Sequence, residues 1–330
     1  MVTIKQVAAH AGVSFKTVSR VVNKDPTVKA VNQEKVLKAI EELGYRPNRA
    51  ASMTRRKHSG VFGLIADELL ETPFTFDIIR GAQDIAWEQN KELMVFNVNE
   101  KRFSAEQAIE HLFEHRVEGI IYAAMYHRVL DIPDDLLKIP AVLVNSSPIK
   151  ENLACVIPDE VQAAETITHS LIAKGYKRIA FLNLNEKIEA AKGRKQGVIN
   201  AFKQHNLPME DLYIESVIIE DKDGEKSITR EATRRVINTF NPDAILCGQD
   251  FMAVEVYFVM QAMGYGVKKD IGIGSFDNWE NTPELLQPML TTMALPHYKM
   301  GQWAMNYLLA GRTDIIKHKE QFELIERESF

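Results

Sequence analysis

The sequence predicts an α/β protein of two lobes, each a doubly wound parallel sheet, preceded by a small all-α head. From Val61 onward, short apolar runs alternate with amphipathic helical stretches, in two series of similar length. Such alternation is typical of parallel sheets covered by helices on both faces. Charge separates the head: residues 1–58 hold 12 Lys and Arg against 4 Asp and Glu, whereas the remainder holds 28 basic and 41 acidic residues. A basic head on an acidic body favours nucleic-acid binding by the head, although a solvated basic face has the same composition.

The head begins with a helix and a tight turn. Ile4, Val7 and Ala8 recur at helical spacing. Gly12 can adopt the positive φ that a sharp turn between helices requires. Ser14 stands at the N-cap position of the next helix, where its hydroxyl can accept from free backbone N–H groups.

The second helix is expected to bury Val18, Val21 and Val22. Its outer face then carries polar and aromatic side chains, namely Phe15, Lys16, Ser19, Arg20 and Asn23. A third helix, over about 32–43, is expected to bury Val36, Leu37, Ile40 and Leu43 and to stop at Gly44. Three short helices with a short turn between the first two predict a helix-turn-helix.

Two segments carry a family resemblance. TIKQVAAHAGVSFKTVSRVVN at 3–23 and YRPNRAA at 45–51 closely resemble the head of the LacI/GalR family of bacterial transcription regulators. The resemblance implies that the second helix enters the DNA major groove. The base-reading positions of the family fall on Phe15, Lys16 and Arg20. The positions that contact the backbone or base edges match Ser14, Thr17, Ser19 and Asn23.

Residues 47–58 follow the head as a basic linker. In the family this stretch is a hinge helix that enters the minor groove of the operator of a dimer. Asn48 would cap this helix, and the leucine wedge of the family falls near Thr54, with Met53 as the replacement wedge after a small shift. The alternative is a flexible basic tether.

The resemblance extends through the body, residues 59–330, and implies the fold of periplasmic sugar-binding proteins. We expect residues 59–159 and 292–330 to form one lobe and residues 160–291 to form the other. In such sheets, ligands bind at the carboxyl ends of the strands, in the cleft between the lobes. The candidate effector-binding residues on this basis are Phe74, Phe76, Tyr126, His127, Asn145, Arg194, Gln249, Asp277 and His297.

Carboxylate, amide and guanidinium groups bind hydroxyls well, and aromatic rings stack on the apolar face of a pyranose. These residue types together indicate a carbohydrate. By resemblance, Arg194 and Asp277 match the most general ligand contacts, whereas Asn145 and Gln249 match more variable ones. ALPHY at 294–298 departs from the commoner Gln-Pro, so Leu295 removes an amide from the cleft and His297 is expected to face it.

Other classes of protein lack their signatures. The start of the chain has no apolar signal-peptide region, and no apolar run approaches a membrane span, so we expect a cytoplasmic protein. Cys155 and Cys247 lie in apolar runs and are expected to be buried free thiols. No phosphate-binding or hydrolase motif is present. HLFEH at 111–115 fits an inverted zinc-protease motif, but its ionisable side chains fall on the solvent side of the predicted helix.

The sequence therefore predicts a homodimeric repressor of carbohydrate-utilisation genes, with no cofactor, no metal and no catalytic activity. Its partners would be a pseudo-palindromic double-stranded DNA operator and a small sugar-type effector, with no membrane involved. A sugar-binding or sugar-converting protein whose head makes protein contacts is the alternative. It does not explain the charge of the head.

Overall fold

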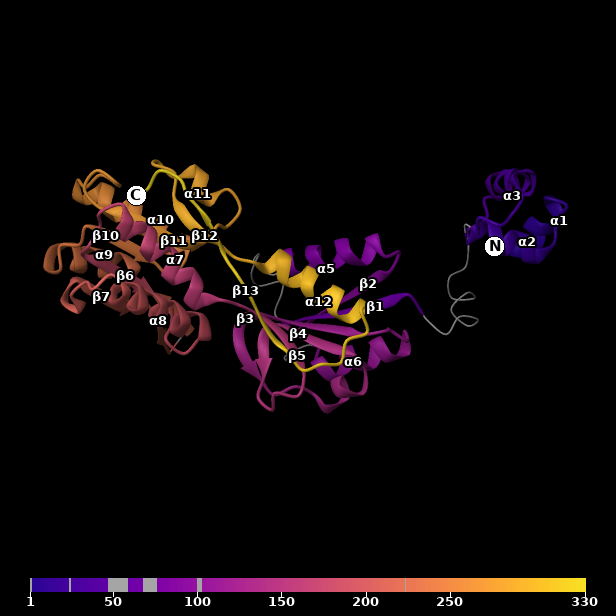
Figure 1. Ribbon diagram of the computed structural model, residues 1–330, viewed down its shortest axis with the longest axis horizontal. Helices are drawn as coiled ribbons and strands as arrows, with labels where there is room; N and C mark the ends of the chain where they lie inside the picture. Colours follow the sequence, from indigo (N-terminus) through magenta and orange to yellow (C-terminus); the bar gives the residue numbers. More distant parts are fainter. Residues whose placement is uncertain (1, 24, 47–58, 68–75, 100–102, 223) are drawn as a thin grey trace. The chain divides into compact units, whose positions relative to one another are not determined.

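The computed structural model describes residues 2–23, 25–46, 59–67, 76–99, 103–222 and 224–330. The chain forms two compact units, Met1–Ser59 and Gly60–Phe330 (Figure 1). We call the first unit the head and the second the body, and each is described by itself.

The head contains α1 (Ile4–His10), α2 (Phe15–Val22) and α3 (Ala30–Leu43). Thr3 and Gln6 form a reciprocal capping box at the start of α1. Ser14 is the N-cap of α2 and accepts a hydrogen bond of 3.1 Å from the Thr17 backbone N–H. Gly12, in the turn between these helices, has a φ of 64°. Local capping therefore sets where both helices begin.

The core of the head consists of Val7, Ala8, Val18, Val21, Val36 and Ala39. The prediction that Leu37 is buried was wrong, because its side chain is 53% exposed. α3 begins at Ala30, two residues earlier than expected. Ala39 takes the inward position because it lies three residues from Val36 on the same helical face.

The first sheet of the body has the strand order β13-β5-β4-β3-β1-β2 in the described part of the chain, and all its neighbouring strands are parallel. Its strands are β1 (Val61–Asp67), β2 (Glu92–Val98), β3 (Ile120–Leu130), β4 (Ala141–Pro148), β5 (Ala154–Pro158) and β13 (Lys317–Glu320). Side chains of α5 (Phe76–Glu88) and α12 (His297–Leu309) complete the core on one face. α6 (Ala105–Glu114) and the 3₁₀ helix Asp134–Lys138 also belong to this lobe.

The second sheet has the order β14-β12-β11-β10-β6-β7, again within the described residues, with only β14 antiparallel to its neighbour. Its strands are β6 (Ile179–Asn183), β7 (Leu212–Ser216), β10 (Ala244–Cys247), β11 (Gly272–Asp277), β12 (Thr291–Ala294) and β14 (Glu323–Ile325). The helices of this lobe are α7 (Glu160–Ala173), α8 (Glu189–Gln204), α9 (Thr229–Thr239), α10 (Asp250–Met263) and α11 (Thr282–Leu285), with the 3₁₀ helix Met209–Asp211.

A two-stranded hairpin, β8 (Ile218–Asp221) and β9 (Gly224–Ser227), follows β7. We call it the β8–β9 hairpin.

The chain passes between the two sheets after β5, between β12 and α12, and again between β13 and β14. The last of these passages is the yellow segment that runs from one lobe to the other in Figure 1. The predicted lobe boundary at residue 292 therefore differs from the structure, since β12 and β14 lie in the second sheet. The reason is pairing: β12 extends the parallel ladder of β11, and β14 closes the free edge of β12.

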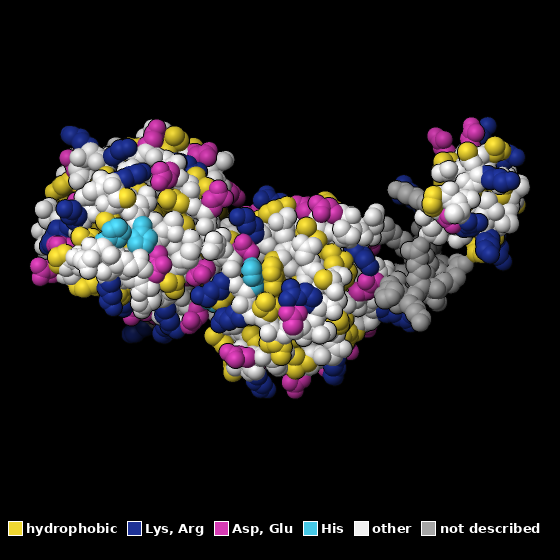
Figure 2. Space-filling view, in the orientation of Figure 1, with side chains coloured by type: hydrophobic (Ala, Val, Ile, Leu, Met, Phe, Trp, Pro, Cys, Tyr) yellow, Lys and Arg dark blue, Asp and Glu magenta, His cyan; other side chains and the backbone are white. Residues whose placement is uncertain are grey.

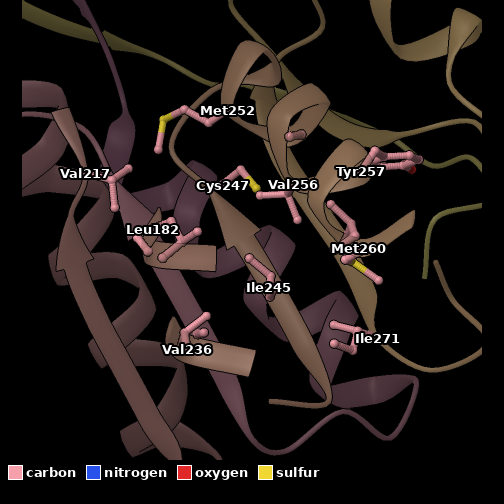
Figure 3. Packing of buried hydrophobic residues seen from close by; sticks show 14 of the residues in the cluster. Leu182, Val217, Val236, Ile245, Cys247, Met252, Val256, Tyr257, Met260 and Ile271 are labelled. Carbon is pink, nitrogen blue, oxygen red and sulfur yellow. The ribbon is translucent and has the colours of Figure 1, made fainter. Parts of the chain in front are cut away.

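Both faces of the second sheet are buried. Along β6, Ile179 and Phe181 point to the core under α7 and α8, while Ala180 and Leu182 point to the core under α9 and α10. This alternation follows from the two-residue period of a strand. Figure 3 shows the second core, where Leu182 and Ile245 pack with Val236, Val256 and Met260.

Both cysteines are free and buried, as predicted. Among the described residues, no helix combines the length and the apolar character that crossing a membrane requires. Figure 2 shows basic and acidic side chains interspersed over the visible face of the body.

Candidate functional site

The structure places the predicted DNA-contacting residues of α2 on the surface of the head. Phe15, Lys16 and Arg20 are exposed, and Phe15 reaches 40% exposure for a large apolar side chain. Thr17 and Ser19 are half-buried beside them. Val18 and Val21 face the core and hold this surface in place.

Three of the predicted contacts also have local roles. Ser14 caps the N-terminus of α2. The Asn23 side-chain amide donates to the Ser19 carbonyl at 2.7 Å and so helps to end the helix. Arg20 Nε lies 2.8 Å from an Asp25 carboxylate oxygen, and this pair holds the pKa of Asp25 below its usual value. The predicted residues Asn48, Met53, Thr54 and Phe74 lie outside the described residues.

A cavity of about 370 Å³ lies within the body, and both lobes line it. Its lining includes seven of the predicted effector residues, namely Tyr126, His127, Asn145, Arg194, Gln249, Asp277 and His297. Phe76, at the first position of α5, does not line the cavity, and its ring is 55% exposed. Gln249 just after β10 and Asp277 at the end of β11 meet at the carboxyl edge of the second sheet, as expected for parallel strands. Asn145 lines the cavity from within β4 of the first sheet.

Arg194 is the main buried charge of the cavity. Its Nε donates to Glu160 Oε2 at 2.7 Å, its Nη1 donates to the Gly248 carbonyl, and Nη1 lies 3.9 Å from Asp277 Oδ1. The guanidinium also lies over the Phe276 ring, with 4.5 Å between Cζ and the ring centroid. The neighbouring carboxylates raise the pKa of Arg194 and outweigh its burial, so the guanidinium is charged.

The position of Asp277 is unfavourable for an ionised carboxylate because the side chain is buried. Burial raises the pKa of its carboxyl well above the usual value, and Asp250 and Glu160 add to this, although Arg194 opposes it. Its φ is 112°, and Asn145 also has a positive φ of 55°. Non-glycine residues in such conformations concentrate at ligand sites, where the surrounding structure holds them.

Asp250 holds the chain around Asp277 in place through hydrogen bonds. It is fully buried, and its carboxylate accepts from the Trp279 backbone N–H at 2.8 Å and from the Thr292 hydroxyl at 2.7 Å. These bonds fasten the loop after β11 to β12, so Asp250 positions Asp277 and does not line the cavity.

Two histidines come from the lobe that contains the first sheet. Burial lowers the pKa of His127, and among the described residues its Nδ1 has no hydrogen-bond partner. A neutral imidazole nitrogen at the cavity can bond a ligand hydroxyl. His297 begins α12 and is 4% exposed, and Leu295 lies beside it in the lining. His297 follows the passage from β12 to α12, and Glu160 follows the passage after β5, whereas His127 lies on β3 within one lobe.

Residues 59–326 match the family described as periplasmic binding proteins and sugar binding domain of LacI family, and residues 3–48 match bacterial regulatory proteins, lacI family. The chain belongs to the LacI family. It is 34% identical over 313 residues to the catabolite control protein A of Priestia megaterium, covering 93% of this chain and 91% of that protein. It is 30% identical over 317 residues to the sucrose operon repressor of Escherichia coli, covering 94% of this chain and 95% of that protein.

The same family includes a solved structure from Rhizobium etli. That LacI-family protein has a TM-score of 0.75 with this chain at 30% identity, covering 82% of this chain and 98% of the other. Its fold is therefore shared over most of the chain.

Sequence reasoning missed several cavity residues of this LacI-family body. Glu160, Leu184, Asn185 and Ile188 lie just after the ends of β5 and β6, and a closer reading of those strand ends would have found them. The contribution of the β8–β9 hairpin was also missed. Its residues are mostly exposed and polar, so their sequence pattern does not differ from that of a loop.

The HLFEH segment has a structural role in this LacI-family chain. His111, Glu114 and His115 are exposed on α6, and His111 stacks on Phe96 and Phe103. Within the described ranges, no group of three or more His, Cys, Asp or Glu residues is arranged to hold a metal ion.

Proposed function

We propose that this protein is a transcriptional repressor of carbohydrate-utilisation genes whose operator affinity is controlled by a sugar bound in the cavity between the lobes. The observation that carries the proposal is the cavity itself. It brings together a fixed guanidinium, a buried carboxylate on a residue with a positive φ, and two amide side chains. Such groups pair with neighbouring hydroxyls, and the family description and the name of the sucrose operon repressor support a sugar.

For the head, we propose that α2 reads the major groove through Phe15, Lys16 and Arg20. Residues 47–58 would form a hinge helix at the centre of the operator, and the operator would be pseudo-palindromic because the protein acts as a homodimer. The chain would then divide into a head at 1–46, a hinge at 47–58 and an effector-binding and dimerising region at 59–330.

The proposal assigns binding and not catalysis to the cavity. Arg194 and Glu160 neutralise each other, and Asp250 is engaged with backbone and hydroxyl donors. As a regulator of bacterial genes, the protein would work in the cytoplasm. Effector binding would change the arrangement of the lobes and so the operator affinity.

A gel shift with the DNA upstream of the gene for this protein tests the proposal. We expect a retarded complex at nanomolar protein that random DNA of equal length does not compete away. Thermal-shift screening then identifies the effector, because a ligand at 100 times its Kd adds about 2.7 kcal/mol to stability. If random DNA competed away the retarded complex as well as the upstream DNA itself does, the protein would not be a sequence-specific regulator.

A further inference from the structure

The cavity has two chemically different ends. Along the carboxyl edge of the second sheet, the lining residues follow the order of the strands: Leu295 after β12, Asp277 on β11, Gln249 after β10 and Leu184 after β6. Arg194 contacts Asp277 and the Gly248 carbonyl, so the polar groups converge at β11 and β10. We call this the polar end.

The other end of the cavity lies beyond β6. There Leu184, Ile188 and Ala190 pack with Ile218 of the β8–β9 hairpin in one apolar cluster. The hairpin also adds Glu225, Lys226 and Ser227 to the lining. The pairing of Ile218 with Ser227 and of Glu220 with Glu225 places these four residues on one face of the hairpin, and Ile219 pairs with Lys226 on the other face. We call this the hairpin end.

The hairpin is fastened to the loop that follows β6. Asn185 donates to Glu225 Oε1 at 3.0 Å, and Lys187 Nζ lies 2.6 Å from Glu220 Oε2. The apolar side chains of the hairpin end and the Glu225 carboxylate are therefore held in place before any ligand enters.

The cavity is larger than one sugar ring. Neighbouring strands lie about 4.8 Å apart, so β11 and β6, two spacings apart in the sheet, are separated by about 10 Å. A six-membered ring of bonds of about 1.5 Å, with its hydroxyl oxygens, measures only about 6 Å across. A sphere of this diameter, roughly 110 Å³, fills less than half of the cavity of about 370 Å³, so one ring at Arg194 and Asp277 leaves room at the hairpin end.

We propose that the effector is a glycoside of at least two sugar units, with one unit at the polar end and a second at the hairpin end. This inference rests on the proposed sugar effector and specifies its class. A second sugar fits because its hydroxyls can hydrogen-bond to Glu225 and Ser227 and its apolar face can pack on Ile188 and Ile218. An aromatic aglycone would leave the polar groups unused. An anionic group could pair with Lys226 but would also face the Glu225 carboxylate, whereas the hydroxyls of a sugar can bond both side chains.

The test compares one-unit and two-unit sugars on the full-length protein by isothermal titration. The probes are glucose, galactose, fructose and their methyl glycosides, against sucrose, maltose, trehalose, cellobiose, lactose and melibiose. We expect at least one disaccharide to bind tenfold or more tightly than each monosaccharide and methyl glycoside. A monosaccharide or methyl glycoside that binds as tightly as every disaccharide would overturn the inference while leaving the sugar effector in place. Failure of all these sugars to bind would overturn both.

Two matched pairs of variants locate the second unit. Ile218→Ala should weaken the disaccharide about tenfold, whereas Ile219→Ala, in the same strand but outside the lining, should leave it within twofold. Glu225→Ala should weaken it similarly, and Glu220→Ala should not, although both glutamates fasten the hairpin. The tightest-binding monosaccharide or methyl glycoside should bind all four variants as it binds the wild type. Equal loss for one-unit and two-unit sugars, or equal loss in Glu225→Ala and Glu220→Ala, would overturn the assignment of the hairpin end.

Discussion

Arg194 and Glu160 form a buried ion pair at the entrance of the chain into the second lobe. The Nε–Oε2 distance is 2.7 Å, and the two side chains are 3% and 5% exposed. Glu160 is the first residue of α7, just after the passage from β5, and Arg194 lies on α8. The pair fixes the guanidinium in the cavity before a ligand arrives and connects the effector site to a passage between the lobes.

This pair leads to the first prediction. Arg194→Ala should weaken effector binding by roughly 30- to 1,000-fold, because a desolvated charged partner costs about 2–4 kcal/mol to lose. Operator binding without effector should stay near wild type, since Arg194 belongs to the body. Isothermal titration and a gel shift measure the two effects. Glu160→Gln should cost less, since the amide oxygen still accepts from Nε. Full effector affinity in Arg194→Ala would place the ligand elsewhere.

The second prediction concerns the raised pKa of Asp277. A carboxyl whose pKa is higher in the folded state than in the unfolded state binds its proton more tightly when the protein is folded. The Asp277 carboxyl therefore contributes stability at low pH, and this contribution is lost as the pH rises through the raised pKa. Asp277→Asn removes the buried charge. We expect the ligand-free variant to melt at a higher temperature than wild type at neutral pH, with the difference shrinking toward pH 4.

Effector binding should fall in Asp277→Asn, because the hydroxyls lose a charged acceptor. Thermal melts from pH 4 to 8, with and without effector, separate the two effects. A melting temperature that is lower than that of wild type at every pH would show that Asp277 stabilises the ligand-free body.

The third prediction concerns base reading by the head. Arg20→Ala should cost about 1–3 kcal/mol on the cognate operator and relax the sequence preference at one position. Lys35→Ala, which removes an exposed cation from α3 instead, serves as the matched control and should change specific binding much less. Gel shifts on the operator and on random DNA measure both. An equal loss on the two DNAs would make Arg20 a phosphate contact.

The fourth prediction concerns residues 47–58. If two hinge helices meet at the centre of a palindromic operator, inserting two base pairs at that centre should abolish tight binding, because the half-sites lose their spacing and rotational phase. Affinity that survives the insertion would identify a flexible tether. Binding to a single half-site provides the reference affinity.

The fifth prediction concerns the packing of α7 on α8. A Cβ atom on Gly197 would lie 2.3 Å from the Val161 carbonyl oxygen and 2.7 Å from Ala164 Cβ. Gly197→Ala should therefore destabilise the body by about 1–3 kcal/mol. Lys203→Ala, exposed on the same helix, should stay within about 0.5 kcal/mol of wild type. Urea unfolding measures both. Equal stability of the two variants would show that α7 moves away at no cost.

The sequence indicated most of the elements because their signals are local. Ser14, Gly12 and the spacing of Val18 and Val21 specify the turn and the second helix within about ten residues. Apolar runs such as IAFLN indicated strands buried on both faces, because neither side of such a strand tolerates polar side chains. Strand ends then indicated where Gln249 and Asp277 meet, since the carboxyl ends of the neighbouring parallel strands β10 and β11 share one edge of the second sheet. Asn145 reaches the cavity from β4 of the first sheet.

Only the tertiary structure decided the remaining features. The assignment of β12 and β14 to the second sheet depends on pairing between segments far apart in the sequence. The partnership of Arg194 with Glu160 requires α7 and α8 to pack at Gly193 and Gly197, and no local pattern specifies that contact. The position of the β8–β9 hairpin beside the cavity also depends on contacts between segments that are far apart in the sequence. Its residues apart from Ile218 and Ile219 are polar and exposed, so their place is set by long-range contacts and not by a hydrophobic period that the sequence displays.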